Sequence, residues 1–305
     1  MGVSDLAYMP ASEGFLGLPP EDAGRPEEAR AVIVPFGLEQ SVSYGGGTSK
    51  GPAAMIAASH EVELFDEEHW CEPFRDFGVA TLQPLEPVKP VPAALEQLAA
   101  TVEQLLALDK FPLVFGGEHS LTAGAIRPFL ARYPDLMLLH FDAHADLRDG
   151  YEGEHYSHAA ALRRCLDDPQ LSLVSVGIRN ISAEEIPFLE ANRQRVQIHW
   201  AKDRARWDPA EIVRPLEGRP VYLTFDLDGF DASLMPSTGT PEPGGFFWDD
   251  AMAIIRAAAG CCRIVGADIN ELAPIEGFHA PDFLAAKLAY KILGYALREG
   301  AQRPG

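Results

Sequence analysis

The sequence lacks several features that would place the protein in a membrane or on a nucleic acid. It contains no run of about 18 apolar residues, the length that a membrane-spanning helix needs. The N-terminus has no basic region followed by an apolar stretch, and Leu6 stands where a myristoylation signal carries Ser or Thr. Lys and Arg number 25 against 45 Asp and Glu, and the net charge of −20 disfavours binding to polyanions. We therefore expect a cytoplasmic protein with no nucleic-acid or membrane partner.

Cysteine is also scarce. The four cysteines form no C-x-x-C pair, and two of them, Cys261 and Cys262, are adjacent. The other two, Cys71 and Cys165, are far apart in the chain. This usage indicates free or buried thiols in a reducing compartment rather than a disulfide framework.

Two motifs that would indicate phosphate or calcium binding are incomplete. The glycine-rich segment 43–52, SYGGGTSKGP, places Lys50 before Gly51, so it does not match a phosphate-binding loop. The segment DLDGFDASLMPS has glycine at its fourth position and Ser237 where a calcium loop carries a bidentate Glu. We expect segment 43–52 to be a turn-rich loop that lines a pocket.

Along the chain, apolar runs alternate with segments of helical spacing. Residues 1–30 are rich in Pro, Gly and Glu and are predicted to form an extended N-terminal arm, and residues 31–305 a single domain. Several of the apolar runs are apolar on both faces, as are strands that lie between two layers of helices. Eight strands are predicted, over 31–36, 77–82, 111–117, 136–142, 171–178, 196–200, 220–228 and 263–272.

The clearest predicted helix is 91–110, where Leu95, Leu98, Val102 and the pair Leu105/Leu106 form one apolar stripe. Further helices are predicted within 120–133, 182–193, 248–260 and 281–300. Strands that alternate with helices predict an α/β fold of three layers, with a mostly parallel, roughly eight-stranded sheet between two layers of helices.

Four of the predicted strands run directly into acidic or histidine side chains. In an open parallel sheet, ligands bind beyond the carboxyl ends of the strands, so these side chains are expected to meet. Asp142, His144 and Asp146 alternate, and an extended backbone would aim all three in one direction. The residues that follow the four strands are Glu118 and His119; Asp142, His144 and Asp146; Asp226 and Asp228; and Asp268 and Glu271.

Crowded carboxylates repel one another unless cations lie among them. Two divalent ions that share carboxylate ligands would neutralise such a cluster, and a set of nitrogen and oxygen donors without thiolate favours Mn over structural Zn. His140 is interpreted as a core or supporting residue rather than a ligand. The predicted metal ligands are His119, Asp142, His144, Asp146, Asp226 and Asp228.

The chain resembles the ureohydrolases, the family of arginases, agmatinases and their relatives. The resemblance extends from about residue 30 to the C-terminus and is carried by GGEHS (116–120), DAHAD (142–146), FDLDGFDASLMPSTGTPEPGG (225–245) and GADINEL (266–272). It implies an arginase-like fold, two Mn²⁺ per chain and assembly as a homotrimer or homohexamer. It also implies that one ion is held by His119, Asp142, Asp146 and Asp226, and the other by Asp142, His144, Asp226 and Asp228.

The resemblance assigns further residues to the reaction at a guanidinium carbon. Glu271 offers a carboxylate that can pair with guanidinium N–H groups. Thr240 corresponds to a hydroxyl that helps to position the guanidinium. In the segment YEGEHYSHAA, His158 matches the family's proton-shuttling histidine best, and His155 is the alternative. If His158 is the shuttle, His155 is predicted to bind the substrate.

The substrate is expected to be a small cationic guanidino compound. Arginases follow the DAHAD-type motif with an Asn that helps to hold the α-carboxylate, whereas this chain has Leu147 and Arg148. Arg148 could still bind a carboxylate, which leaves guanidinobutyrase, arginase and formiminoglutamate hydrolase activity as alternatives. The segments 41–68 (SVSYGGGTSKGP…ASHEVELFDEE) and 151–164 (YEGEHYSHAAALRR) resemble agmatinases more, and hydrolysis of agmatine to putrescine and urea is the prediction. A metal-dependent binding protein without turnover is the alternative outside enzymes.

Overall fold

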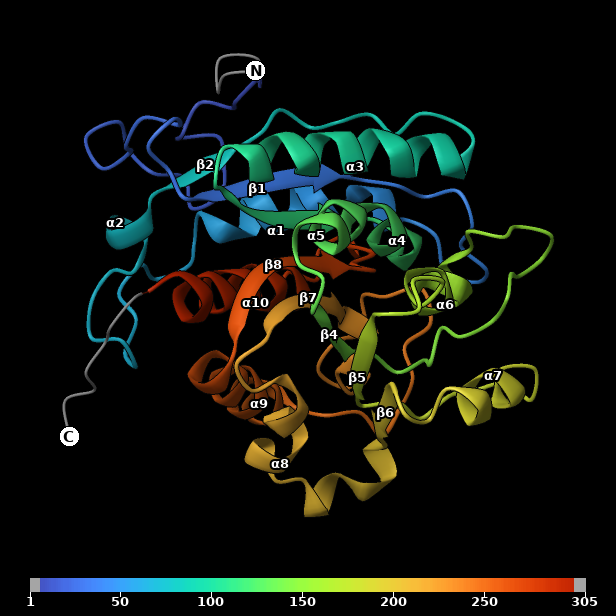
Figure 1. The fold of residues 1–305 in the computed structure, drawn as a ribbon. Coiled ribbons are helices and arrows are strands. Elements are labelled where there is room, and N and C mark those ends of the chain that lie inside the picture. The colour runs from blue at the N-terminus through green and yellow to red at the C-terminus, as the bar shows by residue number, and fades with distance from the viewer. Residues whose placement is uncertain (1–5, 299–305) are drawn as a thin grey trace.

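Eight parallel strands form one sheet in the order β2-β1-β3-β8-β7-β4-β5-β6 in the computed structural model, which describes residues 6–298 (Figure 1). Each predicted strand is present, and the α/β fold with an eight-stranded parallel sheet is confirmed. The strands are β1 (Ala31–Phe36), β2 (Val79–Thr81), β3 (Phe111–Gly116), β4 (Met137–Phe141), β5 (Ser172–Val176), β6 (Val196–His199), β7 (Pro220–Asp226) and β8 (Arg263–Asn270).

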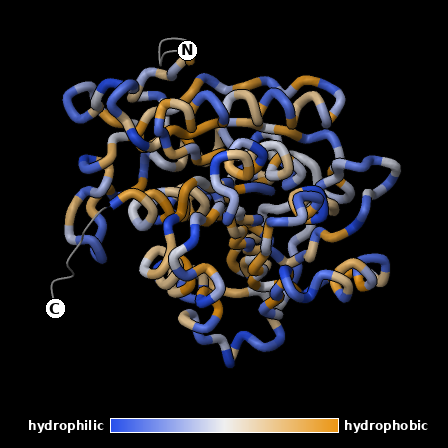
Figure 2. Tube along the Cα trace, viewed as in Figure 1, coloured by the Kyte–Doolittle hydropathy of each residue, from blue (hydrophilic) through white to orange (hydrophobic). Residues whose placement is uncertain are grey.

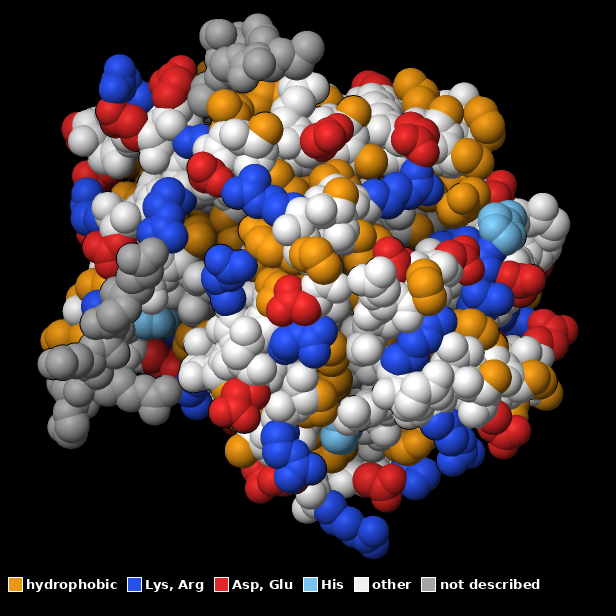
Figure 3. Space-filling view, viewed as in Figure 1, with side chains coloured by type: hydrophobic (Ala, Val, Ile, Leu, Met, Phe, Trp, Pro, Cys, Tyr) orange, Lys and Arg blue, Asp and Glu red, His pale blue; other side chains and the backbone are white. Residues whose placement is uncertain are grey.

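Both faces of the sheet are buried because successive strand side chains enter different hydrophobic cores. Ile33 in β1 and Leu113 in β3 pack in one core, and their neighbours Val32 and Val114 pack in the other. This explains why the inner strands are mostly apolar, whereas the edge strand β6, VQIH, is only partly buried. Figure 2 shows orange, hydrophobic segments in the interior of the trace. Acidic and basic side chains are interspersed over the face of the molecule that Figure 3 shows.

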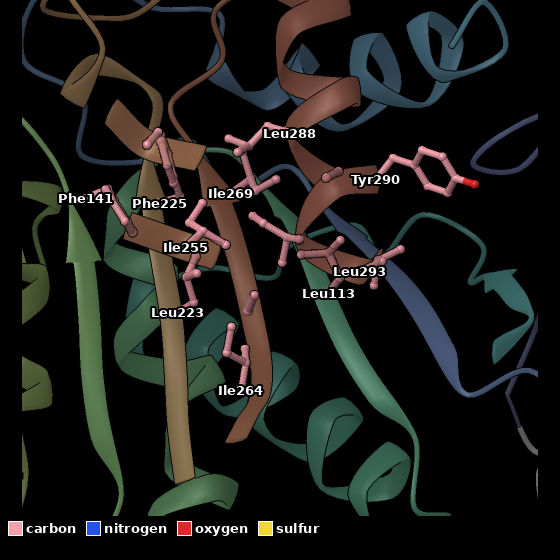
Figure 4. Packing of buried hydrophobic residues seen from close by; sticks show 14 of the residues in the cluster. Leu113, Phe141, Leu223, Phe225, Ile255, Ile264, Ile269, Leu288, Tyr290 and Leu293 are labelled. Carbon is pink, nitrogen blue, oxygen red and sulfur yellow. The ribbon is translucent and has the colours of Figure 1, made fainter. Parts of the chain in front are cut away.

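Two layers of helices cover the sheet. One core contains residues of α3 (Val91–Ala107), α4 (Thr122–Ala125), α5 (Arg127–Arg132) and α6 (Ala161–Cys165). The other contains residues of α1 (Gly51–Ser59), α8 (Pro209–Val213), α9 (Trp248–Cys261) and α10 (Ala280–Leu297). Figure 4 shows Ile255 of α9 and Leu288 of α10 against the strands in this core. The short helices α2 (Phe74–Phe77) and α7 (Ile186–Ala191) complete the helical layers. No helix among residues 6–298 has both the length and the apolar character needed to cross a membrane.

Each predicted helical segment contains a helix, but α1 and the short helices α2, α6 and α8 were not predicted; α1 is the longest of them. Its sequence, GPAAMIAAS, is small and apolar on every side, so it shows no amphipathic period. The predicted helix 120–133 is divided into a 3₁₀ turn (His119–Leu121), α4 and α5, and Pro128 lies in the first turn of α5.

The N-terminal segment packs against the body of the domain. Phe15, Leu16 and Leu18 are buried in the same core as α1, and the backbone N–H of Leu16 donates to Ser59 Oγ at 2.8 Å. Residues 1–5 of the predicted arm and residues 299–300 of the predicted C-terminal helix lie outside the described residues.

A buried ion pair links α10 to the loop that precedes α2. Lys291 Nζ lies 2.9 Å from Asp66 Oδ2, and their side chains are 2% and 1% exposed. Burial opposes ionisation of Asp66, but hydrogen bonds from His69 and Lys291 outweigh it and hold the pKa of Asp66 below its usual range. Burial likewise opposes protonation of Lys291, yet its contacts with Asp66 and Glu67 raise its pKa above the usual range.

We expect Asp66→Asn to lower the free energy of unfolding by about 3 kcal/mol, because it leaves a buried ammonium without its closest partner while Glu67 and Glu68 remain. The carboxyl pKa is lowered by folding and the amine pKa is raised. The pair therefore stabilises fully between about pH 4 and pH 10 and loses this contribution as either group crosses its folded pKa. Urea denaturation of both proteins across this range measures the difference. Glu67→Gln, at a side chain that is 66% exposed, is the matched control, and an equal loss in both variants would contradict the assignment.

Candidate metal centre and substrate cavity

The predicted site residues meet at the carboxyl edge of four neighbouring strands. In the sheet, β3, β8, β7 and β4 lie side by side, although β3 and β8 are more than 140 residues apart in the chain. His119 follows β3, Glu271 follows β8, Asp226 ends β7 and Asp142 follows β4. Parallel pairing of the strands thus brings side chains that are distant in sequence to one edge of the sheet. This meeting was predicted from the residues at the strand ends.

Three carboxylate oxygens surround one nitrogen of His119. Its Nδ1 lies 3.1 Å from Asp142 Oδ2, 3.1 Å from Asp146 Oδ2 and 3.4 Å from Asp226 Oδ2. This nitrogen is buried and has no partner in hydrogen-bonding geometry among residues 6–298. Donor atoms that converge without hydrogen-bonding one another are the arrangement that a metal ion requires.

A second group of donors adjoins the first through Asp142. Nδ1 of His144 lies 2.9 Å from Asp228 Oδ2 and 3.5 Å from Asp142 Oδ1. Asp142 therefore directs Oδ2 toward His119 and Oδ1 toward His144. One carboxylate that faces both groups is suited to bridging two ions.

The protein alone does not balance the charges in this cluster. Burial raises the pKa of Asp146 to about 7, and the charge of Asp142 adds to the effect. Burial and the charges of Asp228 and Asp142 raise the pKa of Asp226 well above its usual range. Burial opposes protonation of His119, but its carboxylate neighbours raise its pKa well above the usual range. The cluster therefore favours bound positive charge, and its nitrogen and oxygen donors without thiolate suit divalent ions such as Mn²⁺.

Simple alternation along a strand explains only part of this geometry. His144 forms a parallel bridge with Asn180, but the backbone bends at Ala143, and the His144 N–H donates to Asp142 Oδ1 at 2.6 Å. Asp146 has a φ of 52°, in the left-handed region, and this turn sets the direction of its side chain. Asp226 and Asp228 are likewise not on one straight strand, because Leu227–Gly229 forms a 3₁₀ turn in which the Asp228 N–H donates to Asp226 Oδ1 at 2.9 Å.

A buried polar layer supports the cluster from within the sheet. Nε2 of His119 lies 2.8 Å from Thr224 Oγ1, and that hydroxyl donates to Asp268 Oδ1 at 2.6 Å. The hydroxyl of Tyr222 donates to Asp268 Oδ2 at 2.8 Å. His140, which was interpreted as a supporting residue, lies with Nε2 2.8 Å from Asp142 Oδ2. These contacts fix the orientation of His119 and Asp142, as the partners of metal-binding side chains generally do.

A cavity of about 320 Å³ opens over the cluster. Glu271, His158, Thr240 and Arg148, all predicted site residues, line it together with the loop at 42–45, which was expected to do so. Several other lining residues were not predicted as site residues; these are Tyr151, Asn180, Ser182, Glu185 and Glu242.

The remaining predicted residues have different surroundings. Thr240 Oγ1 lies 3.5 Å from Asp228 Oδ2, beside the cluster. Arg148 donates to Glu184 Oε2 at 3.0 Å, and its guanidinium lies over the ring of Tyr151. The guanidinium of Arg148 is therefore already paired with a carboxylate of the protein. His155 is not among the cavity residues, and its Nδ1 contacts Arg164 at 2.6 Å.

Glu271 lies at the base of the cavity, next to the cluster. Its φ of 67° turns the chain sharply after β8, and Oε1 accepts the backbone N–H of His119 at 2.7 Å. Burial raises the pKa of Glu271 to about 8, partly opposed by that hydrogen bond. A cation bound beside this carboxylate would offset the cost of its burial.

Comparison with known proteins adds to this geometry. The sequence pattern of the arginase family matches residues 29–294. An N(1)-aminopropylagmatine ureohydrolase from Synechocystis sp. is 34% identical over 277 residues, 88% of this chain and 89% of that protein. An agmatinase from Bacillus cereus is 34% identical, over 82% of this chain and 85% of that protein. The crystal structure of an agmatine ureohydrolase of Thermoplasma volcanium superposes with a TM-score of 0.81 and 28% identity, covering 91% and 93% of the two chains.

We expect the protein reconstituted with Mn²⁺ to hold about two ions per chain, and Asp142→Ala to lose both, because Asp142 faces both donor groups. Elemental analysis after desalting gives the ion count. Asp109→Ala removes a carboxylate that is 83% exposed and should keep the wild-type content. Two tightly held ions in Asp142→Ala would contradict the bridging position.

Proposed function

This chain belongs to the arginase family and is a ureohydrolase, and we propose that it hydrolyses the guanidinium group of agmatine to give putrescine and urea with two Mn²⁺ per chain. The observation that carries the proposal is the buried carboxylate of Glu271, which lines the cavity directly beside the six candidate ligands. A cationic group at this position would gain an ionic partner in a site shielded from water.

The residues present suit the two roles that this reaction requires. The six ligands would hold the divalent ions, whose contribution is to lower the pKa of water so that it can attack at neutral pH. Glu271 Oε1 is fixed by the His119 N–H, and the same carboxylate leaves Oε2 for an N–H of the guanidinium. Thr240, next to Asp228, can accept or donate a further hydrogen bond at the same end of the substrate.

His158 is placed to manage the proton of the departing amine. The C–N bond can break only if the amine nitrogen gains a proton, and His158 lines the cavity with both ring nitrogens near hydroxyl groups. Burial lowers the pKa of His158, so its ring is neutral at pH 7 and can take up and pass on a proton. Its position favours His158 over His155 as the shuttle.

The cavity favours a substrate with a cationic tail because its lining is acidic. Glu185 and Glu242 line it, whereas the guanidinium of Arg148 already pairs with Glu184. The α-carboxylate of arginine would therefore meet acidic side chains and no free cation among these lining residues. The terminal ammonium of agmatine would be attracted by the same groups.

A second candidate substrate is N(1)-aminopropylagmatine, which carries an additional amine. The half-exposed carboxylate of Glu242, 3.9 Å from Nε2 of His144, gives the mouth of the cavity an acidic group that a second amine could reach. Relatives with this named activity are as similar to the chain as the agmatinases are.

On a panel of guanidino compounds, we expect kcat/KM for agmatine to exceed that for arginine at least tenfold. A carboxylate without a partner in this cavity costs more than the roughly 1.4 kcal/mol that this ratio requires. Urea release from agmatine, N(1)-aminopropylagmatine, arginine and 4-guanidinobutyrate, with Mn²⁺ present, measures the order. If arginine or guanidinobutyrate is the best substrate, the cationic-tail assignment is wrong.

Glu271→Gln keeps the shape of the side chain and removes its charge. The bound guanidinium would lose an ionic partner, a loss of roughly 2–5 kcal/mol, or about 30-fold to several thousand-fold in kcat/KM. Mn content and Tm should stay near wild type because Glu271 is not among the six ligands. Glu96→Gln, at a side chain that is 72% exposed, is the control. Retention of more than about a third of wild-type kcat/KM in Glu271→Gln would exclude the role.

A further inference from the structure

A buried carboxylate anchors the loop that covers His158. Glu118 is fully buried, and its Oε2 accepts the backbone N–H groups of Gln40 and Ser41, both at 2.6 Å. Its Oε1 accepts the hydroxyls of Ser120 at 2.6 Å and Ser41 at 2.9 Å. Four donors on one carboxylate fix both the backbone and the side chain of Ser41.

Ser41 also contacts His158 twice. The backbone N–H of His158 donates to Ser41 Oγ at 3.0 Å, and Nδ1 of the same histidine lies 3.3 Å from that oxygen. A hydroxyl has one proton and two acceptor positions. The proton of Ser41 is directed to Glu118, so its oxygen can only accept from His158, both from the backbone N–H and from the ring.

We propose that Glu118 and Ser41 fix the tautomer of His158, with the resting proton on Nδ1 and the lone pair of Nε2 available in the cavity. The inference rests on the proposed function, in which His158 transfers a proton, and it makes Ser41 and Glu118 positioning residues. If Nδ1 carried no proton, its lone pair would face a lone pair of Ser41 Oγ at 3.3 Å, and the two would repel each other.

The other neighbours of the ring agree with this assignment. Ser43, which is exposed on the same loop, lies with Oγ 3.3 Å from Nε2 and can donate to that nitrogen until a substrate replaces it. Ser157 Oγ lies 3.4 Å from Nδ1 and acts as a second acceptor of its proton. Burial lowers the pKa of His158, which keeps the ring in the neutral form, where the choice of tautomer matters. Nε2 is then the atom that takes up and releases the mobile proton.

Nitrogen NMR of the full chain, labelled with ¹⁵N-histidine, tests the tautomer without reference to activity. At about pH 8, above the ordinary histidine pKa near 6.5, protonated and unprotonated ring nitrogens have well-separated shifts. The His158→Gln variant identifies the His158 signals. We expect protonated Nδ1 in the wild type, a shift toward protonated Nε2 in Ser41→Ala, and restoration in Ser41→Thr, which keeps the hydroxyl. Protonated Nε2 in the wild type, or an unchanged pattern in Ser41→Ala, would overturn the proposal.

Kinetics with agmatine give the second readout. Ser41→Ala should lower kcat about 10- to 100-fold, which is less than the roughly 100- to 10,000-fold of a full general acid–base contribution because His158 itself remains, with KM within about twofold of wild type. Ser41→Thr should recover most of kcat. A changed KM with unchanged kcat would contradict a role in proton transfer. Failure of the proposed function gives a different result. In that case the wild-type protein releases no urea from any guanidino compound, whichever tautomer His158 adopts.

Discussion

Repulsion among four buried carboxylates at the carboxyl edge of β3, β8, β7 and β4 is the constraint on which the rest of the site depends. Asp142, Asp146, Asp226 and Asp228 are gathered there by the sheet order and are almost fully buried, so their charges are poorly screened. Two divalent ions bound there would relieve the repulsion and would also supply the chemistry that guanidinium hydrolysis requires. The cavity above the cluster, which Glu271 lines, would favour a cationic substrate for the same electrostatic reason, as we propose.

Two of the side chains at this edge lie on residues with a strained backbone conformation. Asp146 and Glu271 both have positive φ, which costs free energy in residues other than glycine and persists only where the surroundings determine the conformation. At the end of β3, a Cβ on Gly117 would lie 2.0 Å from the backbone oxygen of Leu38, so only glycine allows the two segments to approach. That close approach brings the loop after β1 next to Glu118 and so to the cavity. Backbone strain and tight packing at this edge of the sheet thus hold the side chains of the site in place.

The sequence predicts much of this architecture because its strongest signals are local. Strands that are buried on both faces appear in the sequence as continuous apolar runs, and the acidic residues at the ends of four of them locate the candidate metal centre. Helix α1 was missed because its residues are apolar on all sides. The contact of Arg148 with Glu184, and the network from Glu118 through Ser41 to His158, join segments up to 117 residues apart and have no local pattern. Of the two histidines in segment 151–160, the resemblance favoured His158, and the structure places His158 but not His155 among the cavity residues.

The central claim is that this cluster is built for two divalent ions and that hydrolysis depends on both. The direct measurement is a calorimetric titration of Mn²⁺ into protein stripped with a chelator, with urea release from agmatine followed at each point. The account predicts saturation at two ions per chain, and urea release that reaches its maximum only at that stoichiometry. Saturation at one ion, or full urea release from the stripped protein, would contradict it.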